Sequence, residues 1–255
     1  MSLREIRRSA GEPPPPQKAA AVTIRAVTFD VYSALFDTLA GLTDALAHPL
    51  RRRRVDSNPR PLARAWRQKH MEYLLFATAL GRATPTNRSA IECSAAYALR
   101  ALDPPLGADE LTRLGDAWEH LPPWAEAAGV LHAVRARPLI LAVLSNGDAG
   151  MLHTLLGRLP VRFDHVISTE GGPFKPHPSV YAKALRVLEL SADELLHVAG
   201  SATDAMGAAA AGIRTLWVNR GGDAVVDPRF APAHQGADLR HVLSILEGES
   251  APAAQ

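Results

Sequence analysis

Short runs rich in valine, isoleucine and leucine recur along the chain. Several lack alternating polar positions, which is typical of strands buried on both faces. Helical patterns separate the last four runs, and such alternation predicts a parallel sheet covered by helices on both faces. The predicted strands are AVTIRAVTF (21–29), LILAVLS (139–145), DHVIS (164–168), LLHVAG (195–200) and RTLWVN (214–219), with helices over 148–158, 178–190 and 204–212.

The segment between the first two predicted strands contains no convincing strand. A long helix is predicted over 62–81, where Gly81 ends it, and further helices are predicted over 88–102, 109–120 and 124–136. This is more chain than one crossover connection needs, so we expect an inserted helical subdomain. The predicted organisation is a disordered lead-in (1–20), an α/β core domain (21–37 and 121–250) and a helical cap subdomain (38–120).

Composition narrows the class of protein. The 255 residues carry a formal net charge of +2 without a basic helix, so no nucleic-acid partner is expected. No uncharged apolar stretch reaches the roughly 18 residues of a membrane span, so no membrane partner is expected either. The single cysteine, Cys93, excludes an intrachain disulfide, and its helical setting predicts a buried side chain. Without a secretory signal at the N-terminus, the predicted location is cytoplasmic.

Polar residues with catalytic potential follow four of the predicted strands. Asp30 follows the first strand, Ser145 and Asn146 follow the second, GGPFKPHPSVY (171–181) follows the third, and Asp204 lies shortly after the fourth. Ligands of open parallel sheets bind beyond the carboxyl ends of the strands. We therefore expect two carboxylates, a hydroxyl, an amide and a lysine to meet at one edge of the sheet. For Asp30 the alternative is a turn-forming aspartate.

The residues around Lys175 indicate a position outside a helix. Pro176 and Pro178 push the residues before them into extended backbone, and Pro178 suits the first helical position with His177 as the cap. A lysine near Asp30 would keep that carboxylate ionised. A surface lysine is the alternative interpretation.

Two residues on predicted helices complete this group. Tyr181 falls in the first turn of its helix and could reach back toward Lys175, although a core tyrosine would show the same pattern. Asp204 could also be a first-turn acid that suits the helix dipole.

Arg67 is the predicted site residue of the helical subdomain. It lies beside a stripe formed by Trp66, Tyr73 and Leu80, which is expected to face the core. A guanidinium is always charged and binds carboxylates and other anions. No metal site is predicted, because the histidines show no metal-ligand spacing and are interpreted as surface or cap residues: His48, His70, His132, His153 and His165.

These motifs resemble the haloacid dehalogenase superfamily, and within it the L-2-haloacid dehalogenases (type II), over residues 22–220. The first motif, FDVYSALFD, carries the nucleophilic aspartate at Asp30. Tyr32 stands where the phosphatases of the superfamily place the acid that protonates a leaving alcohol, and a leaving halide needs no proton. The resemblance implies a Rossmann-like parallel sheet covered by helices, the haloacid dehalogenase fold, with an inserted helical cap.

The resemblance also assigns roles to the residues of the site. AWRQKHMEYL (65–74) is similar to the first cap helix of the dehalogenases. The implied catalytic residues are Asp30, Lys175, Asp204 and Arg67, of which Arg67 contacts the departing halide. Pocket lining is implied for Gln68 and Met71, substrate carboxylate binding for Ser145 and halide binding for Asn146. Further substrate-binding positions are predicted at Tyr32, Tyr181 and Ser201. The family further implies a small anionic 2-haloacid substrate, no cofactor and a homodimer.

Several positions depart from the family pattern. Within the first motif, Ser33-Ala34-Leu35 replaces Gly-Thr-Leu. In the fourth motif, Ser-Ser-Asn-x-x-Asp of the family, Ala199 replaces the first serine and Ser201 replaces the asparagine that helps to hold the hydrolytic water. An aromatic residue of the pocket wall is replaced near Thr86.

Three functional interpretations stay open. The first is a hydrolase that converts (S)-2-haloacids into (R)-2-hydroxy acids through an aspartyl ester on Asp30. The second is a Mg²⁺-dependent phosphatase, although Gly200 and Tyr32 stand where phosphatases commonly have aspartates. The third is a non-catalytic member that has lost efficient activation of water.

Overall fold

A computed structural model describes residues 23–56, 58–81 and 85–250, so the predicted lead-in (1–20) lies outside the described residues. Its strands form one parallel sheet in the order β3-β2-β1-β4-β5-β6. The strands are β1 (Ala26–Phe29), β2 (Ile140–Ser145), β3 (His165–Ser168), β4 (Leu195–Ala199), β5 (Arg214–Val218) and β6 (His234–Gly236). The five predicted strands are confirmed, whereas β6 was missed because its three residues show no apolar run.

Helices cover both faces of the sheet because successive side chains of a strand point to opposite faces. On one face, Val27 and Phe29 of β1 pack in a core with α5 (Ala127–Arg135), α6 (Ala149–Leu156) and α9 (His241–Ser250). On the other face, Ala26 packs in a core with α7 (Pro178–Leu188) and α8 (Ala202–Ala210). β1 and β4 are buried along their whole length, and their polar residues Thr28 and His197 are buried together with the apolar ones.

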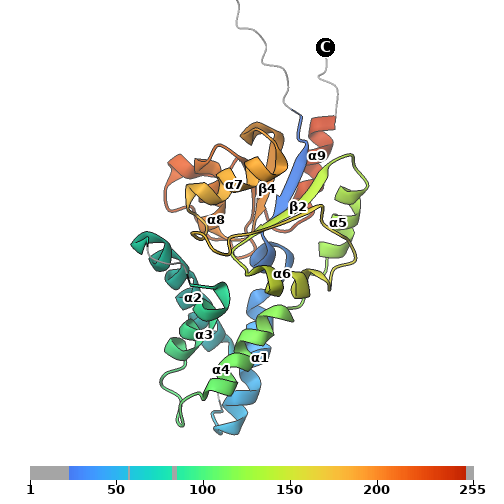
Figure 1. The fold of residues 1–255 in the computed structure, drawn as a ribbon. Helices are drawn as coiled ribbons and strands as arrows, with labels where there is room; N and C mark the ends of the chain where they lie inside the picture. Colours follow the sequence, from blue (N-terminus) through green and yellow to red (C-terminus); the bar gives the residue numbers. More distant parts are fainter. Residues whose placement is uncertain (1–22, 57, 82–84, 251–255) are drawn as a thin grey trace, which may run out of the picture.

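The helices between β1 and β2 form a second body, which we call the helical lobe, beyond the carboxyl end of β1 (Figure 1). It consists of α1 (Thr38–Arg52), α2 (Arg60–Leu80), α3 (Asn87–Ala98), α4 (Ala108–Asp116) and the short 3₁₀ helix η3 (Ala117–Glu119). α1 was missed from the sequence. Its buried positions Leu42, Leu46 and Leu50 follow the helical period, but Pro49 lies inside the helix and hides the pattern.

Two sequence predictions about the helical lobe are wrong. The stripe of Trp66, Tyr73 and Leu80 does not face the core throughout, because Leu80 is 55% exposed while Trp66 is fully buried. Residues seven apart drift by about 20° per heptad around a straight helix. Cys93 is exposed rather than buried, because the buried face of α3 is formed by its neighbours Ala90, Ile91, Ser94 and Ala95.

Among the described residues, no helix is long and apolar enough to cross a membrane.

Candidate active site

Asp30 is fixed by backbone contacts at the end of a central strand. Its N–H donates to the carbonyl of Val198 in β4 at 2.8 Å, and its Oδ2 accepts from the N–H of Ser33 at 3.2 Å. The second bond caps η2 (Val31–Leu35), a π-helix that connects β1 to the helical lobe. The Asp30 side chain is 13% exposed, so its carboxylate is held firmly yet remains accessible at the sheet edge.

Gly200, at the end of β4, lets η2 pack directly against the sheet. A Cβ atom at this position would lie 2.3 Å from the amide nitrogen of Ala34 and 2.3 Å from the carbonyl carbon of Ser33. Backbone atoms cannot yield to such a contact as a flexible side chain could. No side chain therefore fits at position 200 while Asp30 and η2 keep this geometry.

Lys175 links Asp30 to a second carboxylate. Its Nζ lies 3.4 Å from Oδ1 of Asp30 and 2.9 Å from Oδ2 of Asp204. The helix start after Lys175 is as predicted, because Pro178 begins α7 and the His177 side chain caps it. The lysine and both carboxylates thus come together as the strand-end argument predicted.

Two further side chains hold Asp204. The Tyr181 hydroxyl donates to Oδ1 at 2.9 Å, and Nε2 of His197 lies 3.1 Å from Oδ2. A carboxylate oxygen only accepts, so Nε2 of His197 is the donor, while Nδ1 lies 2.9 Å from the Thr28 hydroxyl. Tyr181 therefore contacts Asp204, not Lys175 as the sequence suggested.

The partners of Asp204 determine its charge. Burial by itself would raise the pKa of the Asp204 carboxyl, but Lys175 and His197 together hold that pKa well below its usual range. Burial, reinforced by the Asp204 charge, raises the pKa of the Tyr181 hydroxyl. At neutral pH, Asp204 is a carboxylate and Tyr181 is a neutral donor.

The end of β2 and the loops after β2 and β4 supply the remaining polar groups of the sheet edge. Ser145 is buried, and its Oγ accepts from the N–H of Gly147 at 3.3 Å. Oδ1 of Asn146 accepts from the N–H of Lys175 at 2.8 Å, which ties this amide to the lysine loop. Ser201 caps α8, with its Oγ accepting from the N–H of Asp204 at 3.3 Å.

Arg67 reaches this edge from the helical lobe. Its Nη2 donates to the Ser33 hydroxyl at 3.1 Å, its Nη1 donates to Nδ1 of His70 at 2.8 Å, and its Cζ lies 5.4 Å from the centroid of the Trp118 ring. Burial lowers the pKa of the Arg67 guanidinium, and the nearby Asp30 carboxylate opposes that shift. Within the described residues Arg67 forms no ion pair, so its charge remains available to an anion.

Buried donors without partners lie near Arg67. The Tyr32 hydroxyl, Nδ2 of Asn87 and Nε1 of Trp118 are buried and accept or donate no hydrogen bond within the described part of the chain. The Tyr32 and Trp118 rings meet edge to face at 5.3 Å, and burial, followed by the Asp148 charge, raises the pKa of the Tyr32 hydroxyl. Neutral donors beside a cation favour an anionic ligand.

The structure does not bring every predicted residue to the site. Gln68 is exposed, and its amide donates to Glu72 at 3.3 Å. Each helical residue is rotated by about 100° from its predecessor, so Gln68 points away where Arg67 points inward. Met71 is only partly buried, and Thr86 caps α3 by accepting from the N–H of Ser89.

Sequence reasoning missed five residues around the site, namely His70, Asn87, Trp118, Asp148 and His197. His70 was interpreted as an ordinary histidine, although a residue three positions after Arg67 shares its helix face. His197 lies within the apolar strand β4, where a polar side chain signals a buried partner. For Asn87, Trp118 and Asp148 the sequence carries no comparable signal.

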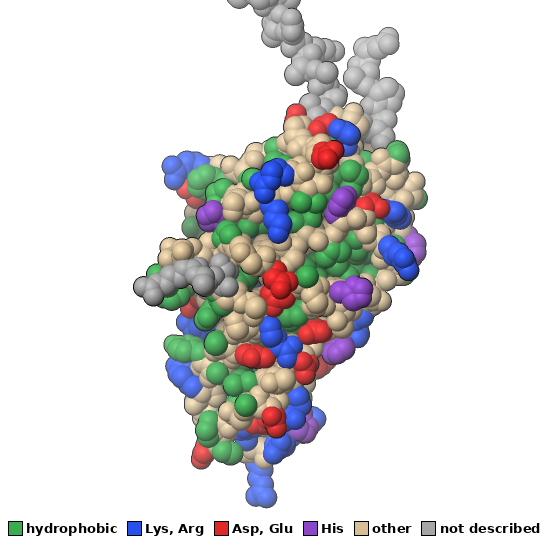
Figure 2. All heavy atoms as spheres, in the orientation of Figure 1, with side chains coloured by type: hydrophobic (Ala, Val, Ile, Leu, Met, Phe, Trp, Pro, Cys, Tyr) green, Lys and Arg blue, Asp and Glu red, His purple; other side chains and the backbone are tan. Residues whose placement is uncertain are grey.

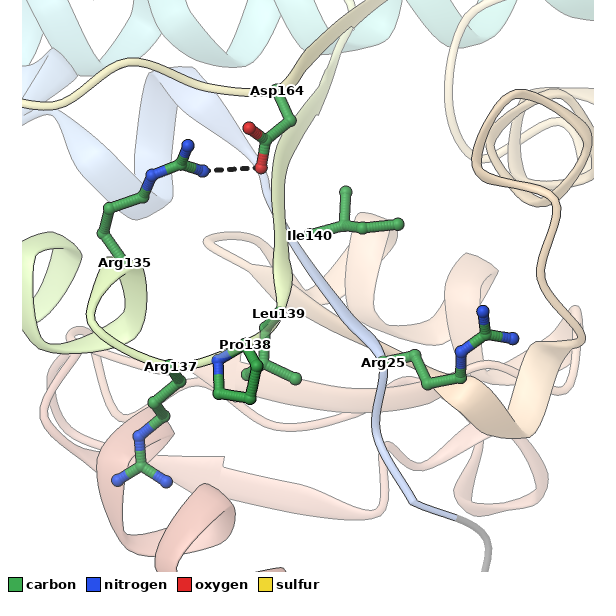
Figure 3. Close-up of a pocket in the computed structure, with 7 residues that line it drawn as sticks. All are labelled: Arg25, Arg135, Arg137, Pro138, Leu139, Ile140 and Asp164. Carbon is green, nitrogen blue, oxygen red and sulfur yellow. Dashed lines mark hydrogen bonds and ion pairs between the residues drawn. The ribbon is translucent and has the colours of Figure 1, made fainter.

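A cavity of about 510 Å³ lies at the opposite end of the sheet, beside the start of β2 (Figure 3). Its arginines are already paired, Arg25 with Glu194 at 2.9 Å and Arg135 with Asp164 at 2.6 Å. Because this cavity lies at the start of β2 and Asp30 lies after the end of β1, the cavity is separate from the group around Asp30.

Comparison with known proteins identifies the family of this chain. Residues 24–212 match the family of haloacid dehalogenase-like hydrolases. The chain belongs to this family. The predicted family and the α/β fold class are thereby confirmed.

Curated relatives of this hydrolase include (S)-2-haloacid dehalogenases. One from Pseudomonas sp. (strain YL) is 31% identical over 229 residues, which cover 88% of this chain and 95% of the relative. Another, H-109 from Pseudomonas putida, is 30% identical over 222 residues, which cover 85% and 95%.

Solved structures show the same fold. The L-2-haloacid dehalogenase of Xanthobacter autotrophicus with chloropropionic acid covalently bound superposes with a TM-score of 0.78 at 27% identity, covering 89% of this chain and 99% of that chain. A further L-2-haloacid dehalogenase gives a TM-score of 0.80 at 30% identity, covering 88% and 99%.

Proposed function

We propose that this hydrolase converts (S)-2-haloacids into (R)-2-hydroxy acids and halide through an ester on Asp30. The observation that carries the proposal is the position of Arg67 close enough to Asp30 for that carboxylate to affect its pKa, while no carboxylate in the described residues forms an ion pair with Arg67. The relatives named as (S)-2-haloacid dehalogenases, and the structure with covalently bound chloropropionic acid, support it.

The first step is a displacement at carbon. An oxygen of the Asp30 carboxylate attacks C2 of the substrate, and the carbon–halogen bond breaks with its electron pair going to the halide. Attack from behind inverts C2. Negative charge grows on the halogen as this bond breaks. The Arg67 guanidinium therefore stabilises the transition state more than it stabilises the bound substrate.

The second step is hydrolysis of the ester. Water attacks the carboxyl carbon of Asp30, the bond from that carbon to the substrate oxygen breaks, and the hydroxy acid leaves with one proton released overall. Lys175 lies near Asp30 and stabilises negative charge on the aspartyl oxygens, and Asp204 orients the lysine. The oxygen taken from water stays on Asp30.

The remaining residues bind the small anion. We assign the substrate carboxylate to Ser145, and the halide to Asn146 together with Arg67. Oδ1 of Asn146 is occupied by the N–H of Lys175, which leaves the Nδ2 donor for the halide. We also assign the helical lobe as the cap that closes over this substrate.

A magnesium-dependent phosphatase fits the residues poorly. Phosphatases of the superfamily commonly place an aspartate at the position of Gly200, and a Cβ there would lie 2.3 Å from the backbone of η2. Tyr32 supplies a neutral hydroxyl where they have a second carboxylate. The described residues also contain no group of three or more histidine, cysteine or acidic side chains that could hold a metal ion. We therefore propose a reaction without a cofactor.

We further infer a cytoplasmic homodimer. A single cysteine suits a reducing compartment such as the cytoplasm.

The inferred dimer interface lies on the helical lobe. This lobe carries an apolar groove of about 820 Å³, lined in part by Tyr73, Leu75, Phe76 and Tyr97. Hydrophobic side chains lie on the surface of this lobe over α2 and α3 (Figure 2). Exposed apolar patches of this kind are typical of protein interfaces.

Halide release from the two enantiomers of 2-chloropropionate tests the function. We expect chloride and (R)-lactate from the (S) enantiomer only, with the same rate in EDTA. Asp30→Asn should abolish release, and Asp44→Asn, which changes an exposed aspartate on α1, should retain it. Activity restored only by Mg²⁺ would favour the phosphatase. No chloride, bromide or fluoride from any 2-haloacid would leave only the family assignment.

A further inference from the structure

A chain of buried and partly buried hydrogen bonds runs from the loop after β2 to Arg67. We propose that His70 and Asn87 are positioning residues that hold Arg67 against Asp30, and that Asp148 ties both to the sheet. This inference rests on the proposed function only for the role of Arg67, and the geometry of the chain of bonds stands independently.

The first link fixes the state of His70. The Arg67 guanidinium has only donors, so Nδ1 of His70, 2.8 Å away, must accept. The ring hydrogen therefore sits on Nε2, which lies 2.9 Å from Oδ1 of Asn87. His70 is 1% exposed, and burial, assisted by the Arg67 charge, lowers its pKa to about 3. The imidazole stays neutral and remains an acceptor near neutral pH.

The second link connects Asn87 to the sheet. Asn87 is the first residue of α3, and the N–H groups of Asn87 and Arg88 donate to the two carboxylate oxygens of Asp148, each at 2.8 Å. A carboxylate at a helix N-terminus is also favoured by the helix dipole. Asp148 follows Asn146 by two residues, so the proposed halide contacts Asn146 and Arg67 share one support.

A neutral partner suits the role of Arg67. A long arginine side chain loses rotamer entropy when it is held in one position, so it needs contacts to hold it there. A carboxylate in place of His70 would hold the guanidinium but would also neutralise it. His70 and Trp118, whose rings lie 4.6 Å apart, fix the guanidinium and leave its charge to the substrate.

Substitutions separate positioning from general stability. His70→Leu removes both bonds of the imidazole, whereas His70→Asn keeps an acceptor for Arg67. We expect His70→Leu to lower kcat for (S)-2-chloropropionate by about 10- to 100-fold with a smaller change in KM, and His70→Asn to recover a large part. Asn87→Ala should lower kcat by about tenfold. The control is Ser94→Ala, which removes a buried hydroxyl on α3 whose partner among the described residues is the carbonyl of Ile91, and it should retain activity.

A double-mutant cycle tests whether His70 acts through Arg67. In an Arg67→Ala background, His70→Leu should cause little further loss, because the group it positions is already absent. Fully additive losses would overturn the proposal, as would wild-type kcat in a folded His70→Leu variant. Thermal unfolding of each variant identifies any loss that comes from misfolding, in which case His70→Asn and Asn87→Ala decide.

An activity-independent measurement keeps this proposal separate from the proposed function. Imidazole ¹⁵N spectra should show His70 as the Nε2–H tautomer, neutral down to about pH 4, with an Nδ1 resonance that moves in Arg67→Ala. An Nδ1–H tautomer, or titration near the ordinary histidine pKa, would contradict the chain of bonds. These spectra remain decisive even if no 2-haloacid releases halide, which would defeat the proposed function alone.

Discussion

Charge pairing distinguishes the residues of this site from one another. Asp204 is buried with Lys175 and His197 as partners, so its charge is compensated within the protein. Arg67 is held by neutral groups, and its charge is left for a ligand. Asp30 lies between the two, 3.4 Å from the lysine and near the guanidinium. The site is thus arranged to hold a nucleophile and to receive an anion.

The first prediction concerns Arg67. Arg67→Ala should lower kcat for (S)-2-haloacids by about 10²- to 10³-fold, because the lost interaction strengthens as the halide departs. Steady-state halide release measures the loss. Arg64→Ala is the matched control, since Arg64 lies three residues earlier on α2 and is exposed. Equal activity of Arg67→Ala and the wild type would show that the helical lobe does not act on the leaving group.

The second prediction concerns hydrolysis of the ester. Ser201 replaces an asparagine that orients water in the dehalogenases, and its hydroxyl is engaged as the cap of α8. We expect a burst of halide, slow turnover and an adduct on Asp30 visible by intact mass. Ser201→Asn should speed loss of the adduct, and turnover in H₂¹⁸O should label Asp30. If burst, adduct and label are all absent, no ester forms.

At the scale of elements, the contact between η2 and the end of β4 decides the shape of the sheet edge. The backbone of Ser33 and Ala34 occupies the space where a side chain at position 200 would stand. The short helix η2 therefore caps Asp30 and also requires glycine at position 200, at the end of β4.

The third prediction follows from this contact. Gly200→Ala should lower the free energy of unfolding by about 1–3 kcal/mol, because the added methyl group forces the backbone of η2 to move. Urea unfolding measures the change. Gly221→Ala is the control, since a Cβ there meets no atom within 4 Å. Similar stabilities of the two variants would show that η2 yields without cost.

The fourth prediction concerns an ion pair that joins α1 to α4. Arg53 donates to both oxygens of Glu110, at 2.8 and 2.7 Å, and these hydrogen bonds lower the pKa of Glu110 to about 2. The pKa of Glu110 is lower in the folded than in the unfolded protein, so the pair stabilises the fold at pH values above the ordinary pKa of 4.5. This contribution is lost as the pH falls toward 2.

Glu110→Gln should therefore cost about 1–2 kcal/mol at pH 7, a value kept small by solvent screening, and less at pH 3. Urea unfolding at both pH values measures it. Asp109→Asn, which changes an exposed neighbour on the same helix, should show a smaller effect. A cost that does not shrink in acid would mean that charge is not its source.

At the scale of the whole molecule, two bodies meet at the site and one outer face of the helical lobe remains apolar. The Asp148 carboxylate, in the loop after β2, binds the start of α3. The Thr78 hydroxyl of α2 accepts from the N–H of Phe174, in the loop after β3. These two loops therefore join the lobe to the sheet. Away from this junction, Phe76 is 64% exposed and Tyr97 is 50% exposed.

The fifth prediction concerns the proposed dimer. Light scattering should give the mass of a dimer for the wild type, and Phe76→Glu should shift it toward a monomer because a charge in an apolar interface is costly. Val226→Glu is the control, because Val226 is 86% exposed and lies outside the helical lobe. A monomeric wild type, or a dimer insensitive to Phe76→Glu, would contradict this interface.

Sequence alone determined the strands β1 to β5 of the sheet and the residues at their ends. The apolar runs of β1, β2, β4 and β5 specify buried parallel strands, and a parallel sheet brings its carboxyl ends to one edge. Asp30, Lys175 and Asp204 were therefore predictable as neighbours, and the motifs around them placed the chain in its family before any contact was known.

Only the tertiary structure decided which side chains meet. Helix rotation places Gln68 and His70 on different faces of α2, but only the contact between Arg67 and Ser33 of η2 shows that the face of Arg67 and His70 is the one turned to the sheet edge. Tyr181 contacts Asp204 because α7 and α8 pack on the same face of the sheet. His197 and Asp148 gained their roles from partners far along the chain. Local periodicity fixes which face a residue occupies, whereas its partner depends on how distant elements pack.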